Sequence, residues 1–489
     1  YRAFFGGDQC GVFGGFGTIS LRRIKDIREK YIAIENNVTI VSKKKKILGG
    51  ARGQSREAVR GGDREKGVGD IVYGLSHMYH HQKEKFLRLT KNLPKFTFLE
   101  THIIHQNLPE VANWINHYGL ELSDKLKSYY LSELVPLGSD FSVSLQLENI
   151  YQRFTSVDIQ ADIEKNIKNT EDFVISSNHQ QVHLKVALNN SSIDPVFNKR
   201  LGCLGLLMLT LQKQQEAHVA IVLSQVRKKL NWNYSYHLRK KDDLPSSIGP
   251  REVNTGSSWV GHCNGIFLWR TEEIEKVLCH EMGHCLGMDT YPVPEDFIQQ
   301  CRHRFCVPLD TDIRPCETWV EMWSLVVNLA VNGHLISEKN SCTTSETEKI
   351  TNLLYQWEKR WHFFQIAKIL VYFGFEKVED FYSIKGFDPD DPNRFKFNQQ
   401  TSVISYFILK SALWSNLEGW LKWCHNHPDP FKLRSAYWGG YQQLVWKCLD
   451  AEWMENINRM IPVVKQCLKA GRCNRELNCF RMTCVEIDV

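Results

Sequence analysis

Two histidines four residues apart restrict the folding of this chain more than any other feature. His280 and His284 belong to an HExxH pattern inside residues 271–289, which read TEEIEKVLCHEMGHCLGMD. Side chains four positions apart lie on one face of an α-helix, where two imidazoles can share one zinc ion. Thr271, followed by two glutamates, is a suitable N-cap, and Gly287 can end the helix. We therefore predict a capped helix that carries a metal site.

Glu281 directly follows the first of these histidines. A carboxylate at this position reaches a metal-activated water molecule rather than the metal, and it can take the proton of that water. A short apolar run at 265–269, GIFLW, predicts a strand just upstream, where zinc peptidases place the edge strand that binds substrate. The pattern favours zinc-dependent hydrolysis of a peptide bond, with Glu281 as general base and Zn2+ as cofactor. The alternative is an ordinary surface helix with two unrelated histidines.

A catalytic zinc ion needs a third protein ligand, and two positions compete for this role. In the pattern HExxHxxGxxH the third ligand would be residue 290, but that residue is Thr290, and Asp289 comes one place early. Glu317 and Glu321, by contrast, lie four residues apart on an apolar helix, where carboxylates are costly unless they are paired or bind metal. We predict that Glu317 is the ligand and that Glu321 accepts the far N–H of a liganding histidine. The alternative is that both glutamates form buried salt bridges.

Other polar residues near the motif are weaker candidates for a role in the site. Tyr291, just beyond the helix, and His303 are the candidates for a group that stabilises an oxyanion. His303, Asp310 and Asp312 lie between the two motifs and are further candidates for metal binding.

Several segments around the motif can be compared with a known group of proteins. They are VNTG at 253–256, IFLWRTEE at 266–273, Lys276 with Val277 before the HExxH pattern, and QQTSVISY at 399–406. Together they resemble the HExxH metallopeptidases encoded by large DNA viruses. The ExxxE helix at Glu317 also resembles that of the lethal-factor type of gluzincin. The likeness covers about residues 200–425 and implies a gluzincin-like zinc site in a viral protein, without assigning a substrate.

Apolar patterning divides the chain into regions. They are a Gly-rich and basic segment or linker at 1–70, a mixed domain of unknown role at 71–200, a zincin-like metallopeptidase domain at 201–425 and a helical, cysteine-containing region at 426–489. Helical spacing of apolar residues recurs at 319–331, 350–373 and 403–423. The predicted fold class is therefore α+β, with a zincin-like catalytic region, a small sheet and a largely helical C-terminal half.

Composition limits the class of protein and its partners. With 43% hydrophobic and 24% charged residues, the 489-residue chain is typical of globular proteins with about three domains. Its apolar runs are far shorter than the ~18 residues of a membrane span. The net charge of +6, from 61 Lys and Arg against 55 Asp and Glu, does not favour a nucleic-acid partner.

The cysteines bear on the cellular compartment. The chain contains 15 of them, and none forms a CxxC pair. No N-terminal segment has the pattern of a signal peptide, so we expect free thiols in a reducing compartment rather than disulfides. These features predict a cytoplasmic or virion-associated protein.

A rival hypothesis is a virion or scaffold protein that keeps a zinc site without turnover. The glycine-rich N-terminus and the basic block at 43–66 would suit packing against scaffold partners. A purely structural zinc site has no need of Glu281, so this residue favours the hydrolase, whose partner is a protein or peptide substrate. A nucleic-acid-binding protein is a third hypothesis, and it rests on the basic block alone.

Overall fold

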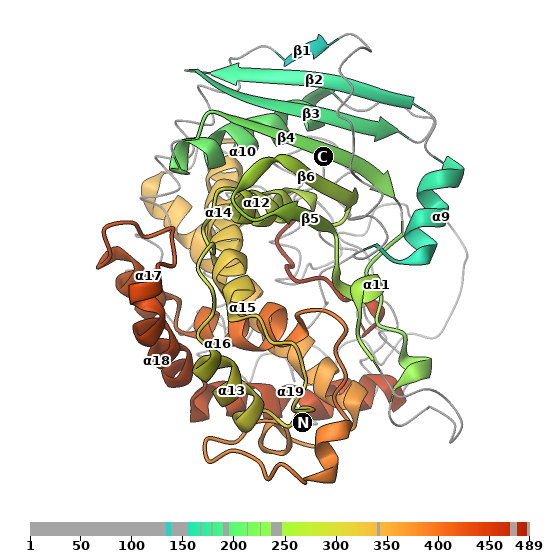
Figure 1. The fold of residues 1–489 in the computed structure, drawn as a ribbon, viewed down its shortest axis with the longest axis vertical. Helices are drawn as coiled ribbons and strands as arrows, with labels where there is room; N and C mark the ends of the chain where they lie inside the picture. The colour runs from blue at the N-terminus through green and yellow to red at the C-terminus, as the bar shows by residue number, and fades with distance from the viewer. Residues whose placement is uncertain are drawn as a thin grey trace, which may run out of the picture. The chain divides into compact units, whose positions relative to one another are not determined.

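The computed structural model describes residues 134–137, 155–166, 169–177, 179–188, 195–212, 214–224, 226–235, 247–339, 343–469 and 477–486. Over these residues the fold is mixed α+β, with one small sheet and a largely helical C-terminal half, as the sequence predicts (Figure 1). The predicted Gly-rich and basic segment at 1–70 lies outside the described residues.

The sheet has the strand order β1-β2-β3-β4-β6-β5. Its strands are β1 (Leu134–Leu137), β2 (Asn169–Ser177), β3 (Gln180–Leu188), β4 (Glu216–Ser224), β5 (Gly256–Trp259) and β6 (His262–Arg270). β3, β4 and β6 run parallel, whereas β1, β2 and β5 pair antiparallel with their neighbours. The strand predicted at 265–269 is confirmed as β6, but the prediction that it is an edge strand is wrong. β5 lies outside β6, because a tight turn folds these two strands into a hairpin.

Helices lie on both faces of the sheet. α10 (Pro195–Gln212) and α12 (Ile274–Cys285) contact each other on one face, with α10 against β2 and β3 and α12 against β5 and β6. On the opposite face, α9 (Val157–Asn166) packs against β4. The contact is an apolar cluster made of Ile159, Ala220, Val222, Phe267 and Trp269. Successive residues of a strand point to opposite faces, so the even-numbered residues of β4 share the face that α9 covers in part.

The C-terminal half consists of helices packed around tryptophans. They are α13 (Glu295–Arg304), α14 (Pro315–Lys339), α15 (Thr344–Phe373), α16 (Lys410–Ser415), α17 (Leu417–His425), α18 (Trp438–Cys448) and α19 (Ala451–Lys469). Trp319 and Trp323 of α14 contact Trp420 of α17, with ring centroids 5.6 and 4.8 Å apart. This aromatic packing holds α14 against the helices that follow it.

The helices predicted at 319–331 and 350–373 are confirmed as α14 and α15. The helix predicted at 403–423 is wrong as a continuous element. A π-helical segment (Ile404–Leu409) continues directly into α16, and Asn416, which takes a non-helical conformation with φ −119° and ψ 48°, separates α16 from α17.

The unit that contains the sheet extends beyond the predicted catalytic region. A central strand satisfies its backbone only when it is paired on both sides, so β4 needs β3 from the region 71–200 as well as β6. The boundary predicted at residue 200 accordingly falls inside α10. Residues 477–486 run beside α14 and α15, where the carbonyls of Val485 and Arg481 accept from Asn328 at 2.9 Å and Trp361 at 3.0 Å. The described residues between 134 and 335 and between 344 and 486 therefore belong to one compact unit.

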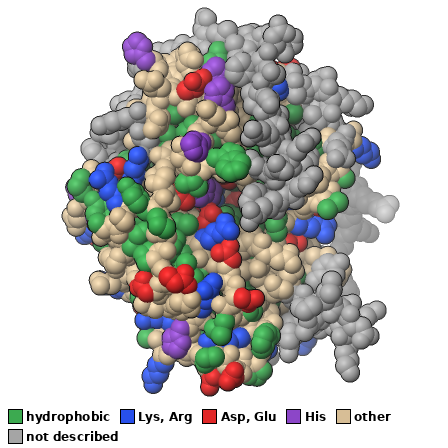
Figure 2. Space-filling model, viewed as in Figure 1, with side chains coloured by type: hydrophobic (Ala, Val, Ile, Leu, Met, Phe, Trp, Pro, Cys, Tyr) green, Lys and Arg blue, Asp and Glu red, His purple; other side chains and the backbone are tan. Residues whose placement is uncertain are grey.

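The distribution of charge and of apolar helices bears on whether the protein binds nucleic acid or a membrane. On the face shown in Figure 2, basic and acidic side chains are interspersed. No helix in the described part of the chain has the length and apolar character needed to cross a membrane.

Candidate metal centre

The HExxH pattern lies on α12, where all residues from Ile274 to Cys285 are buried. The sequence predicts Thr271 as the N-cap, but the helix begins after Glu273, which has a φ of 59° and makes no side-chain cap. Partners far away in the sequence stabilise this start instead: Glu486 accepts from the Glu273 N–H at 2.6 Å, and Lys228 donates to the Glu273 carboxylate at 2.7 Å. The N-cap prediction was wrong because a buried helix end takes tertiary partners in place of a local cap. Gly287, with a φ of 73°, follows the helix at the place where the sequence predicts its end.

α12 and α14 bring three ligand atoms into one group. His280 Nε2 and His284 Nε2 are 3.1 Å apart, and Glu317 Oε2 lies 3.4 Å from the first and 3.1 Å from the second. Metal–ligand bonds of about 2.0–2.1 Å at tetrahedral angles separate two ligand atoms by about 3.3 Å. These atoms therefore already form one triangular face of a tetrahedral site, from the residues that the sequence predicts as ligands.

The opposite nitrogen of each imidazole faces a carboxylate. His280 Nδ1 lies 3.1 Å from Glu321 Oε2, and His284 Nδ1 lies 2.8 Å from Asp289 Oδ2. Because a carboxylate accepts hydrogen bonds, each Nδ1 carries a proton, and each Nε2 of a neutral ring presents a lone pair to Glu317. Three acceptors that converge in this way are satisfied by a cation. Asp289, the competing ligand in the sequence, therefore orients His284 rather than joining the group.

Without a cation, protons take its place between these acceptors. Burial lowers the pKa of His284, but Asp289 and Glu317 outweigh burial and hold this pKa well above the usual 6.5. Burial also lowers the pKa of His280, and its contacts with Glu317 and Glu321 again reverse the sign. A metal ion must displace these protons when it binds.

Glu321 is the partner of two buried lysines as well as of His280. Its side chain is fully buried, contacts Lys276 Nζ, and lies 3.3 Å from Lys410 Nζ. Burial raises the pKa of Glu321, but Lys276 and Lys410 outweigh burial and hold this pKa well below 4.5. Glu321 thus faces the far nitrogen of His280, and it also makes the buried salt bridges that the alternative hypothesis assigned to both glutamates.

Glu281 projects from α12 toward the edge strand β5. Its Oε2 accepts from Ser258 Oγ at 2.7 Å, and burial raises the pKa of its carboxyl group. Gly256 makes this position possible, since a Cβ atom there would lie 2.7 Å from Glu281 Cγ and 2.8 Å from Oε1. A carboxyl group with a raised pKa suits a general base that works near neutral pH.

Tyr406 is a member of the site that the sequence analysis did not assign. It lies on the π-helical segment and donates to Glu317 Oε2 at 3.0 Å, and its ring centroid is 5.8 Å from that of His280. Burial, followed by the nearby Glu317 carboxylate, raises the pKa of Tyr406 well above 10, so its hydroxyl group is a hydrogen-bond donor. The only signal for it in the sequence is its place in the segment 399–406, which contributes to the viral resemblance.

The residues predicted as oxyanion helpers lie elsewhere. The Tyr291 side chain is 39% exposed, and His303 Nε2 contacts the carbonyl of Lys385 at 3.1 Å. Asp312, a weaker metal-ligand candidate, does line the cavity beside the histidines, where it pairs with Arg314 at 2.7 Å. Neither Tyr291, His303 nor Asp310 lines the cavity beside the histidines, whereas Tyr406 does.

This cavity has a volume of about 390 Å³. His280, Glu281, His284 and Glu317 line it, together with β5 residues and the segment 399–402. In the described sheet β5 is the outermost strand on this side, so its outer backbone groups face away from β6. An extended chain can pair with such an edge.

One disulfide lies next to the site. Cys263 of β6 is bonded to Cys285 of α12, which directly follows His284. The expectation of free thiols throughout is therefore wrong for this pair, because the contact of β6 with α12 brings two distant cysteines together. Other cysteines of the described residues are free thiols: Cys203, Cys279, Cys301, Cys306, Cys316, Cys424, Cys448, Cys479 and Cys484.

No protein-family model, curated protein or solved structure matches this chain. The resemblance to the viral HExxH metallopeptidases therefore stays a prediction from the sequence.

Proposed function

We propose that this protein hydrolyses peptide bonds by means of a zinc ion bound to His280, His284 and Glu317. One observation carries the proposal: three acceptor atoms, 3.1–3.4 Å apart, converge beside the Glu281 carboxylate in one cavity. Two histidines and a glutamate form a ligand set typical of catalytic zinc, which keeps a further position for water or substrate.

A bound zinc ion would supply a Lewis acid that polarises the peptide carbonyl and lowers the pKa of water. Glu281 takes the proton of the attacking water and passes it to the leaving amine, for which its raised pKa is suited. Ser258 donates to Glu281 Oε2 at 2.7 Å and so holds the carboxylate in place beside the cavity that Glu281 lines. Tyr406 Oη, 3.0 Å from Glu317, is the donor best placed to stabilise charge that develops on the carbonyl oxygen.

The substrate in this proposal is a protein or peptide in extended conformation. β5 is the outer strand next to Glu281, so a peptide paired with it would pass its backbone beside the cavity. Gly256 and Ser258 belong to this strand and also contact or approach Glu281. The same short strand thus supports both the general base and the substrate.

The rival proposal, a virion or scaffold protein with a structural zinc site, calls for four protein ligands. The described residues contribute three to this group, and Glu281 beside them has no structural purpose in such a site. The geometry therefore supports the hydrolase better. A cytoplasmic or virion-associated location remains a proposal that rests on the sequence.

The test compares wild type with Glu281→Gln and His280→Ala in zinc content and in digestion of a broad peptide library. We expect Glu281→Gln to keep zinc but lose cleavage, whereas His280→Ala loses both. Glu295→Gln, at an exposed glutamate of α13, is the matched control and should behave as wild type. Cleavage that survives in Glu281→Gln would refute the proposed mechanism, and a zinc-loaded wild type without any cleavage would favour the scaffold.

A further inference from the structure

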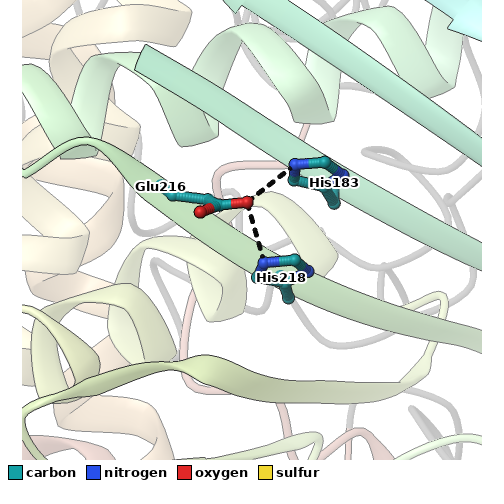
Figure 3. A group of neighbouring side chains, drawn as sticks. All are labelled: His183, Glu216 and His218. Carbon is teal, nitrogen blue, oxygen red and sulfur yellow. Dashed lines mark hydrogen bonds and ion pairs between the residues drawn. The ribbon is translucent and has the colours of Figure 1, made fainter. Parts of the chain in front are cut away.

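A second group of metal-ligating side chains lies on the sheet, on strands β3 and β4. His183 and His218 stand directly opposite each other in the parallel ladder, and Glu216 precedes His218 by two residues on the same face. The two imidazole rings are stacked, with centroids 4.5 Å apart and planes 8° from parallel. Figure 3 shows the Glu216 carboxylate reaching across the edges of both rings.

The three side chains converge on one oxygen atom. Glu216 Oε1 lies 2.9 Å from His183 Nε2 and 3.0 Å from His218 Nε2. The ligand atoms of the group all lie within 4.8 Å of one another, so small side-chain rotations bring them to the separation of about 3.3 Å that a tetrahedral ion requires. Strand pairing already fixes the backbone positions of both histidines, so metal binding costs little conformational entropy of the backbone.

This group is separate from the HExxH group. Val182 and Ala217, the neighbours of His183 and His218, are fully buried, and Val182 lies against α10. Since side chains alternate along a strand, His183 and His218 point to the other face of the sheet, away from α10 and α12. The two groups therefore lie on opposite faces.

An ion can reach the second group from solvent. The exposed fractions of the His183 and His218 side chains are 14% and 18%, and that of Glu216 is 51%. Glu216 holds this geometry through its hydrogen bond with His218 and its ion-pair contact with His183, and a divalent ion displaces the protons of this cluster when it binds.

We propose that His183, Glu216 and His218 form a second site, which binds a divalent late transition-metal ion and clips β3 to β4. Two imidazoles and one carboxylate suit zinc, copper or nickel rather than magnesium or calcium, which prefer oxygen ligands. Bonds from both strands to one ion oppose their separation, so the ion stabilises the parallel pair at the centre of the sheet. This site has no part in peptide hydrolysis.

The experiment titrates the metal-stripped full chain with Zn2+ and measures bound zinc per chain by elemental analysis. We expect about two equivalents in wild type. About one should remain in His280→Ala/His284→Ala, which keeps the sheet site, and about one in His183→Gln/His218→Gln, which keeps the HExxH site and its cleavage. Loss of a ligand should lower the affinity for the second zinc ion by more than about 100-fold, since loss of a hydrogen bond to a ligand alone lowers metal affinity by about 10–100-fold.

Controls separate a lost ligand from a lost fold. Glu216→Gln changes a half-exposed side chain and should also remove the second equivalent, while circular dichroism stays unchanged. His262→Ala removes an exposed histidine of β6 and should keep both equivalents. The proposal is overturned if the second equivalent persists in His183→Gln/His218→Gln, if it needs millimolar zinc in wild type, or if His280→Ala/His284→Ala binds no zinc. If the peptidase proposal fails, either cleavage is absent with these zinc counts unchanged, or wild type binds one equivalent that persists in His280→Ala/His284→Ala and is lost in His183→Gln/His218→Gln.

Discussion

Glu317 and Glu321 lie one turn apart on α14, and replacing each with glutamine should give opposite results. Glu321 faces two buried lysines, whereas Glu317 faces the cavity and the two Nε2 atoms. Each Glu→Gln change keeps the size of the side chain and removes its charge. The pair therefore distinguishes the residue that binds the metal from the residue that stabilises the fold.

Glu321→Gln leaves Lys276 and Lys410 buried without their shared counter-charge. Removal of one partner from a buried ion pair costs about 3–5 kcal/mol, and we expect a loss of this size in the free energy of unfolding. Zinc affinity should fall by about 10–100-fold, because His280 loses the carboxylate that orients it.

Glu317→Gln should cost only about 1–2 kcal/mol in the free energy of unfolding, since both histidines can release the protons that Glu317 attracts. Zinc affinity should fall by more than about 100-fold, because a neutral amide replaces a carboxylate that binds the metal directly. This loss exceeds the factor of about 10–100 expected when only a hydrogen bond to a ligand is removed.

The assays are urea denaturation in the presence of a chelator and zinc competition at neutral pH. Because the Glu321 pKa is held well below 4.5, its contribution to stability is present above that pH and is lost as the pH falls through the lowered value. The difference between wild type and Glu321→Gln should therefore shrink in strong acid. Equal losses of stability in the two variants, or a larger loss of zinc affinity in Glu321→Gln, would refute this assignment.

Three further predictions concern the cavity. Gly256→Ala should keep zinc but reduce cleavage, because the new Cβ would lie within 2.8 Å of Glu281; a kinetic assay with parallel metal analysis measures both, and unchanged kcat/KM would contradict the contact. Tyr406→Phe should lower kcat by about 100–1000-fold, as loss of an oxyanion donor does, with little change in zinc content; a wild-type kcat would exclude that role. Zinc affinity should fall as the pH falls, by about tenfold per unit for each proton displaced, because the pKa of His284 lies well above 6.5; a flat profile from pH 6 to 8 in chelator competition would contradict this.

The parts of the site that the sequence predicts are those set by local geometry. His280, Glu281 and His284 share one helix, and Glu317 and Glu321 share another, so the i, i+4 spacing alone places each set on one face. The position of GIFLW before the helix similarly predicts β6, because short apolar runs of this kind pair in sheets.

The remaining parts depend on contacts between distant residues. Tyr406 reaches Glu317 over 89 residues, through a π-helical segment that has no periodic signature. His183 and His218 meet only because β3 and β4 pair in one register. Glu273 replaces Thr271 at the helix start for the same reason, since its partner Glu486 is 213 residues away.

The long separation between α12 and residues 477–486 has a consequence for the timing of biosynthesis. The start of α12 needs Glu486 and Thr483, and Lys410 beneath the site donates to the carbonyl of Met482 at 2.8 Å. At about 5–20 residues per second, a ribosome that has made α12 adds these partners about 10–40 s later. A growing chain thus carries the HExxH helix before it can hold that helix in place, so the proposed metal site would not be complete until residues 477–486 have been added. Truncation after residue 476 should accordingly lower zinc content and leave α12 open to limited proteolysis, whereas a truncated chain with full zinc content would show that the helix matures earlier.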